Sequence, residues 1–293
     1  MSKPFDFAYI GFDNRAVESA STITATNLAA GYSAASLQNW QVFDNVVFNA
    51  GAGSVTIDCG AARSIDYFSI VGHSLFSTNA DDIIIEAASN AGFTTDLVTL
   101  ATLSLDVGGS VPAYSGSYAL DGNTALSSQQ VYSDPIISFK LDTISRRYYR
   151  ITFTAAAECR IGVIALGQRL TFDLGFYGGF TPPSLNESTD VTNNKSESGQ
   201  YLGRSIVREG VSPMTINLNP VRRSWVDAKW TPFRRHADLY PFIFSWGNNP
   251  LVDNMYGLQK SWQPSKAVKR IRDGSGNLVQ WMSVGIQFEG VIK

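Results

Sequence analysis

The chain has 293 residues, of which 44% are hydrophobic and 12% aromatic, and its formal net charge is −2. This length favours two domains, and the apolar content argues against a disordered chain. No apolar run of about 18 residues occurs, so no membrane-spanning helix is expected. The N-terminus also lacks the basic start and apolar core of a signal peptide.

Charge is divided unevenly along the chain. Residues 1–168 hold eight Lys and Arg against fifteen Asp and Glu, a balance of −7, whereas residues 169–293 hold fifteen against ten, a balance of +5. Such asymmetry indicates two domains with different neighbours, or subunits that stack an acidic face on a basic one. It is too mild to predict sequence-specific binding of nucleic acid.

The first half of the chain reads as short strands. Residues 5–12 predict the first strand, and residues 83–88 and 135–141 predict further ones. Residues 107–130 are rich in Gly, Ser, Ala and Tyr, which predicts a long surface loop.

Two alternating segments dominate this half. Residues 54–75 predict a strand, a turn at 60–63 and a second strand, and residues 146–166 repeat the pattern. Two matched pairs with only short strands between them predict one β-sandwich closed by its own ends. The side chains expected to face inward are Val55, Ile57, Cys59, Ile65, Tyr67 or Phe68, Ile70, Tyr149, Ile151, Phe153, Ile161, Val163 and Ile164.

The motifs of this region resemble a known family. Trp40, the pattern V-x-I-D-x-G at 55–60, Gly-His at 72–73 and R-Y-Y-R-I-T-F at 147–153 are similar to the discoidin-like, galactose-binding-like sandwich. The resemblance implies an eight-stranded jelly roll that binds glycans, lipids or proteins. If its rim binds a glycan, the candidate contact residues are Trp40, His73, Phe76 and Tyr114.

A linker or arm is predicted at residues 169–199. Residues 172–180 combine glycines with aromatic side chains, and residues 186–199 are nearly free of apolar groups. The polar stretch is expected to be exposed or mobile unless a partner orders it. The aromatic stretch is expected either to pack between domains or to grip a neighbouring subunit.

Residues 200–293 predict a second, β-rich domain with one helix. Residues 205–218 alternate, and Val221, Trp225, Ala228 and Pro232 recur at helical spacing. Pro232 is expected either to end this helix or to lie in the first turn of a second one. Strands are expected at 241–246, 255–262 and 280–291, with a hairpin turn at 273–277.

A second resemblance concerns the whole chain. The run R-I-G-V-I-A-L-G at 160–167, followed by G-Q-Y-L-G-R-S at 199–205, resembles phage tail-tip or minor tail proteins, and the element order of residues 200–293 is similar to a tail-tube fold. This implies a structural virion protein that is assembled in the host cytoplasm and forms a homo-oligomeric ring at the tail tip. Its partners would be the tail tube, the tape measure and the baseplate hub. The interface candidates are Phe176, Tyr177, Phe180, Trp225 and Trp281.

No constellation of residues predicts catalysis. The two histidines, His73 and His236, cannot be assigned to a catalytic triad, and Asp81 and Asp82 would point to opposite faces of a strand. Cys59 and Cys159 are expected to be buried thiols, with a disulfide as the alternative. We therefore expect no enzyme, no metal and no cofactor.

The sequence thus predicts a mainly β protein. Its parts are a jelly-roll sandwich at 1–168, a linker at 169–199 and a tail-tube-like domain at 200–293. The first functional prediction is a ring-forming component of a phage tail tip, joined by strand pairing between subunits. The alternative is a carbohydrate-binding module for attachment to a host glycan. A polysaccharide-degrading enzyme is disfavoured because no acid/base pair is found.

Overall fold

The structure is a computed structural model, and it describes residues 8–75, 78, 82–104, 113–114, 136–172, 187–211, 214–247, 251, 253–272 and 278–290. The chain divides into two compact units. The sandwich unit comprises Gly11–Arg169 and Asn248–Asn254, and the second unit comprises the remainder. None of the helices in the described residues is long and apolar enough to cross a membrane.

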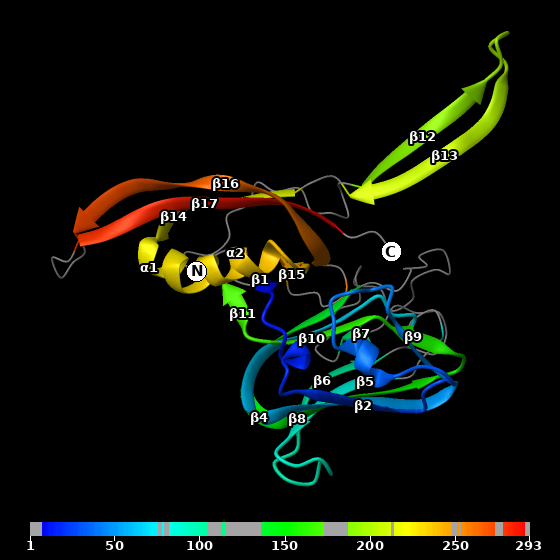
Figure 1. Cartoon of the computed structure of the whole chain (residues 1–293), viewed down its shortest axis with the longest axis vertical. Coiled ribbons are helices and arrows are strands. Elements are labelled where there is room, and N and C mark those ends of the chain that lie inside the picture. The colour runs from blue at the N-terminus through cyan, green and yellow to red at the C-terminus, as the bar shows by residue number, and fades with distance from the viewer. Residues whose placement is uncertain are drawn as a thin grey trace. The chain divides into compact units, whose positions relative to one another are not determined.

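The sandwich unit is built from one large sheet and one small ribbon (Figure 1). The large sheet has the order β10-β4-β8-β5-β6-β7, with β2 also paired to β4, and the ribbon joins β3 to β9. Two short 3₁₀ helices, η1 (Arg15–Val17) and η2 (Ala34–Leu37), complete the unit. Its strands are β2 (Thr22–Thr26), β3 (Val46–Phe48), β4 (Gly51–Val71), β5 (Ile83–Ala88), β6 (Val98–Ser104), β7 (Ala113–Tyr114), β8 (Ile137–Ala155), β9 (Cys159–Ile161) and β10 (Val163–Gly167).

The predicted turn at 60–63 is a bend within one strand. β4 runs unbroken over 21 residues and pairs with β8 on both sides of this point, from Asp58 opposite Tyr148 to Arg63 opposite Arg146. The extra residues on β4 form a bulge, and Gly60 takes a φ of +71° there. The bulge bends β4, so its first half pairs with β2 and its second half with β10.

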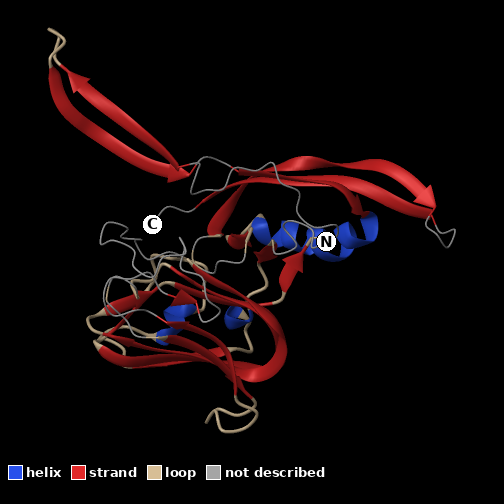
Figure 2. Ribbon diagram, turned by 180° about the vertical axis from the view of Figure 1, so that it is seen from behind, coloured by secondary structure: helices blue, strands red, loops and turns tan. Residues whose placement is uncertain are grey.

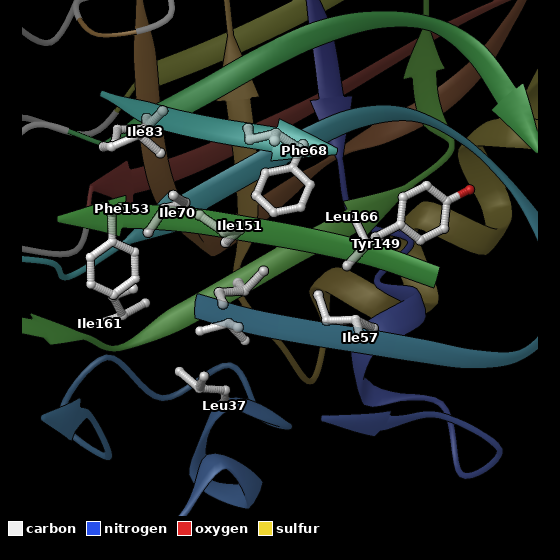
Figure 3. Close-up of a cluster of buried hydrophobic side chains, with 14 of the residues drawn as sticks. Leu37, Ile57, Phe68, Ile70, Ile83, Tyr149, Ile151, Phe153, Ile161 and Leu166 are labelled. Carbon is white, nitrogen blue, oxygen red and sulfur yellow. The ribbon is translucent and has the colours of Figure 1, made fainter. Parts of the chain in front are cut away.

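The two halves of β4 line a single hydrophobic core (Figure 3). All the side chains predicted to face inward are buried, including both Tyr67 and Phe68. The pairing of β10 with residues 67–71 of β4 confirms that the ends of the sandwich close on each other. The mainly β fold with a β-sandwich is therefore confirmed.

The cysteines are buried free thiols rather than a disulfide. Cys59 and Cys159 are 0% and 1% exposed, and they are not bonded to each other. Burial raises the pKa of each thiol to about 11, because the thiolate would lose its hydration. Both cysteines therefore act as small apolar core residues.

The second unit carries a six-stranded sheet of order β11-β1-β15-β16-β17-β14. The short apolar strand predicted at 241–246 is β15, and the predicted terminal hairpin is β16 with β17. The bounds are β1 (Tyr9–Gly11), β11 (Arg169–Thr171), β14 (Met214–Arg222), β15 (Phe242–Ser245), β16 (Asn254–Arg272) and β17 (Leu278–Gly290).

One helical segment lies along this sheet (Figure 2). It runs through α1 (Arg223–Trp225), a π-helical turn η4 (Val226–Trp230) and α2 (Thr231–Ala237), with Pro232 in the first turn of α2. The buried stripe differs from the predicted one: Val226, Trp230, Phe233 and Ala237 are buried, whereas Ala228 and Pro232 are exposed. Val221, the first residue of the predicted stripe, lies in β14, and the helix starts only at Arg223, so the predicted register is wrong although the spacing of the buried residues is the predicted one.

The polar part of the predicted linker forms a strand. β12 (Glu187–Lys195) pairs antiparallel with β13 (Tyr201–Val211) as a separate two-stranded sheet. The partner that orders β12 is thus the next segment of the same chain. The aromatic arm at 173–180 lies outside the described residues.

The units depart from the predicted boundaries at two places. β1 belongs to the sheet of the second unit, although residues 5–12 were expected to begin the sandwich. Conversely, Leu251 comes from the C-terminal half and lies in the core of the sandwich unit. The physical reason is burial of apolar side chains: β1 buries Tyr9 and Ile10 in the sheet of the second unit, and Leu251 is buried in the core of the sandwich.

Candidate functional site

Two of the predicted glycan-contact residues are interior. Trp40 is 6% exposed and His73 is 2% exposed, and His73 Nδ1 accepts a hydrogen bond from the backbone N–H of Leu75 at 3.2 Å. Neither ring offers a face to a ligand, which corrects the expectation that they lie at the surface of the rim. Phe76 and the side chain of Tyr114 lie outside the described residues.

Phe43, which lies between Trp40 and β3, is an exposed aromatic residue. Phe43 is 80% exposed, more than any other large hydrophobic side chain among the described residues. It lies in a turn over residues 41–44, which the N–H of Asp44 closes by donating to the carbonyl of Gln41 at 3.3 Å. The turn therefore holds an apolar ring out in solvent.

Asn39 clamps both ends of this turn. Its Oδ1 accepts from the N–H of Gln41 at 2.7 Å, and its Nδ2 donates to Oδ2 of Asp44 at 2.8 Å. The side chain of Asn45 also donates to the carbonyl of Phe43 at 3.3 Å. These side-chain bonds replace strand pairing and fix the backbone around Phe43.

Val42 packs the turn against Gly72 and Gly162 of the sandwich. A Cβ added to Gly72 would overlap Val42 Cγ1, and a Cβ added to Gly162 would lie 2.7 Å from the carbonyl oxygen of Val42. Gly72 also has a φ of +65°, in the region that favours glycine. The close approach of Val42 to these two glycines, which we call the Val42 latch, positions Phe43.

The segment after β4 and the strand β9 lie at the same end of the sandwich as the latch. Gly72 and Ser74 follow the end of β4, and Ser74 exchanges two hydrogen bonds with the backbone of Arg160 in β9, each 3.0 Å long. Arg160 is exposed on the side of the ribbon away from the core. The rim thus offers an aromatic ring, side-chain amides and charged groups, which suits a polar ligand with an apolar face.

The sequence around Phe43 carries a signal that the motifs quoted above do not include. Asn39, Asp44 and Asn45 are residues that favour turns, and they surround a large apolar residue. The ring of Phe43 is exposed, so it does not stabilise the core of its own unit. Such a placement is a reason to expect a contact with another molecule.

The structure describes two of the interface candidates. The Trp225 indole N–H donates to the carbonyl of Thr171 at 3.0 Å, and its ring packs 6.0 Å from that of Trp230, so it is engaged within its own unit. Trp281 is half-buried on β17, opposite Arg222 of β14. Phe176, Tyr177 and Phe180 lie outside the described residues.

Within the described ranges, no three His, Cys, Asp or Glu side chains gather closely enough to hold a metal ion. His236 is engaged locally, with Nε2 at 2.9 Å from the carbonyl oxygen of Pro241. Asp81 lies among the residues that are not described. The expectation that the chain is not an enzyme therefore stays a prediction.

No protein-family model matches the chain, and no curated protein matches it. Solved structures resemble about half of it. A Ruminococcus gnavus GH29 fucosidase in complex with fucose is 11% identical at a TM-score of 0.39, with 54% of this chain and 27% of that chain covered. The module CpGH89CBM32-6 produced by Clostridium perfringens is 16% identical at a TM-score of 0.35, with coverages of 53% and 98%.

A third structure is chitosan-binding module 1 of a chitosanase/glucanase from Paenibacillus sp. IK-5. It is 12% identical at a TM-score of 0.36, with 53% of this chain and 98% of that module covered. The matched part of this chain spans about a quarter of the fucosidase. Likeness at this level says nothing about what this chain binds.

Proposed function

We propose that the sandwich unit is a carbohydrate-binding module whose central contact is Phe43. The observation that carries this proposal is a phenyl ring 80% exposed on a turn that Asn39 and the Val42 latch hold in place. Sugars present an apolar C–H face and polar hydroxyl edges. A fixed ring beside amide groups matches both features.

The expected strength of this contact follows from area. If a sugar ring covers about 80 Å² of the phenyl face, at about 25 cal/mol per Å², it gains about 2 kcal/mol. Hydrogen bonds already hold the turn in the free protein, so we expect little ordering entropy to oppose binding. One such platform supports a weak, selective contact that gains strength when several copies bind together.

We expect Phe43→Ala to weaken glycan binding by about 30-fold, the equivalent of 2 kcal/mol. The full-length protein is screened on a glycan array, and the best saccharide is then titrated against both proteins by calorimetry. Because Phe43 is exposed, its removal leaves the melting temperature within about 2 °C of the wild type.

Leu97→Ala is the matched control. Leu97 is 46% exposed. It lies near the bend of β4, because the backbone carbonyl of its neighbour Asp96 accepts a hydrogen bond from Arg146, whereas the Val42 latch lies at the end of β4. Leu97→Ala is expected to bind like the wild type. If no glycan binds, or if Phe43→Ala binds as tightly as the wild type, the proposal fails.

A second candidate function is assembly into a ring at a phage tail tip. It is supported by the motifs at 160–167 and 199–205 and by β14, which ends the order of the six-stranded sheet and pairs only with β17 among the described strands. An open strand edge offers backbone groups to a strand of another subunit. In this proposal the chain is a virion protein with the tail tube, tape measure and baseplate hub as neighbours, and the sandwich serves host attachment.

Light scattering of the purified chain at several concentrations tests the assembly. We expect a closed homo-oligomer whose share grows with concentration, because strand addition joins identical subunits into rings. A mass that stays at that of one 31.9 kDa chain at every concentration would contradict self-assembly. It would leave the carbohydrate-binding proposal untouched.

A further inference from the structure

In the part of the second unit that the structure describes, the helical segment lies on one face of the sheet and no helix lies on the other. On β14 and β17 the residues that face the helical segment are buried: Met214, Ile216, Leu218, Val221, Val284, Ile286 and Phe288. The alternate residues face the other way. We call the latter surface of β14, β17 and β16 the outer face.

The strand register aligns the outer face in rows across the three strands. Thr215, Gln287 and Ser261 form one row, and Ser261 Oγ donates to Oε1 of Gln287 at 3.0 Å. The next row is Asn217, Gly285 and Gln263. The rows beyond contain Ser283 with Lys266, and then Arg222, Trp281 and Lys269.

The middle of this face is polar. A Cβ on Gly285 would lie 2.5 Å from Oδ1 of Asn217 and 3.0 Å from Cγ of Gln263. The side chains of Asn217 and Gln263 therefore close over Gly285, which is itself buried, and both side chains are exposed. Exposed amide groups side by side suit a ligand with many hydroxyl groups.

One end of the outer face is cationic. Arg222 lies opposite Trp281 in the register, and exposed Lys266 follows in the next row. At the opposite end, Oε2 of Glu289 forms an ion pair with Nζ of Lys260 at 3.2 Å.

We propose that the outer face binds an anionic oligosaccharide. The sugar ring stacks on Trp281, its carboxylate or sulfate groups pair with Arg222 and Lys266, and its hydroxyls bond to Asn217 and Gln263. A single-stranded nucleic acid fits less well, because such chains need successive aromatic platforms and the described rows contain one.

This site is separate from Phe43 and does not rest on the function proposed for the sandwich. The test titrates the full-length protein with a sulfated heparin hexasaccharide, a carboxylated oligogalacturonate and neutral cellohexaose. We expect the protein to bind one or both anionic probes, more weakly as salt rises, and not to bind the neutral one. Comparing the two anions identifies which acid group is preferred.

Variants locate the site. Arg222→Gln and Trp281→Ala are each expected to lower the affinity at least tenfold while the melting temperature changes little. Lys260→Gln, which changes a cation at the far end of the same face, and Phe43→Ala are expected to bind like the wild type. Lys266→Gln supplies a second charge variant if Arg222→Gln impairs folding.

Three results would overturn the inference. The first is that neither anionic probe binds. The second is that binding is unaffected by Trp281→Ala and by the charge variants, or is abolished by Phe43→Ala, which would place the ligand on the sandwich. The third is equal or tighter binding of oligo-dT, which would make the face a nucleic-acid site.

Discussion

Asn14→Ala is expected to destabilise the sandwich unit by about 3 kcal/mol. Asn14 is 5% exposed, and its side-chain amide makes hydrogen bonds to the backbone of β10. Nδ2 donates to the carbonyl of Ile164 at 3.0 Å, and Oδ1 accepts from the N–H of Leu166 at 3.2 Å. Removing the amide leaves two backbone groups unpaired beside buried side chains.

The same amide also starts the first 3₁₀ helix. Oδ1 of Asn14 accepts from the N–H of Ala16 at 3.0 Å, so the substitution also removes the N-cap of η1. For a unit of this size, about 3 kcal/mol lowers the melting temperature by roughly 6–12 °C. Differential scanning calorimetry measures the shift.

Asn49→Ala is the matched control for this experiment. Asn49 is exposed and donates to the carbonyls of Asn27 and Leu28 at 3.4 and 3.0 Å, where water can replace the lost amide. We expect a loss below about 1 kcal/mol. Equal shifts for Asn14→Ala and Asn49→Ala would contradict the role of burial.

Gly72→Ala is expected to cost about 2–4 kcal/mol and to remove glycan binding. The new Cβ would overlap Val42 Cγ1, and alanine at a φ of +65° adds backbone strain. The turn at 41–44 must shift to relieve the overlap, which carries Phe43 away from its position. Thermal unfolding and calorimetric titration with the saccharide follow the two effects.

A double variant separates the latch from a general loss of stability. Val42→Ala removes the overlapping methyl, so Gly72→Ala is expected to cost about 1–2 kcal/mol less in the Val42→Ala background than in the wild type. Additive costs would contradict the latch. Tight saccharide binding by Gly72→Ala would show that the latch does not position Phe43.

The sequence predicted the sandwich where alternation was long. In β4 and β8, residues such as Ile57 and Ile151 face the core as expected, because a strand with one buried face must alternate. The bend at Gly60 looks like a turn in the sequence, since a bulged strand and a turn use the same small residues. Alternation gives the direction of side chains but not whether the strand continues.

The failures in the second unit have a different cause. The helix was expected with Ala228 and Pro232 in its buried stripe, but that stripe was counted from Val221, which lies in β14 before the helix begins. β1 and Leu251 lie in units other than those that contain their sequence neighbours. Such crossings depend on contacts between distant segments, which local patterns do not record.

The candidate site was only partly predictable. Trp40 was a candidate contact residue, but its side chain is buried. Phe43 is the exposed ring, and its place depends on the hydrogen bonds of Asn39 and on Val42 meeting two glycines. These glycines lie more than 25 residues from Val42 in the chain, so the local sequence indicates a turn and not its orientation.

The most direct test of the central claim, that Phe43 is the carbohydrate contact, is a crystal structure of the full chain with the best saccharide from the array. We expect a sugar ring stacked on the phenyl face of Phe43, with its hydroxyls near the amides of the turn at 41–45. A saccharide bound elsewhere on the sandwich, with Phe43 still open to solvent, would contradict the claim.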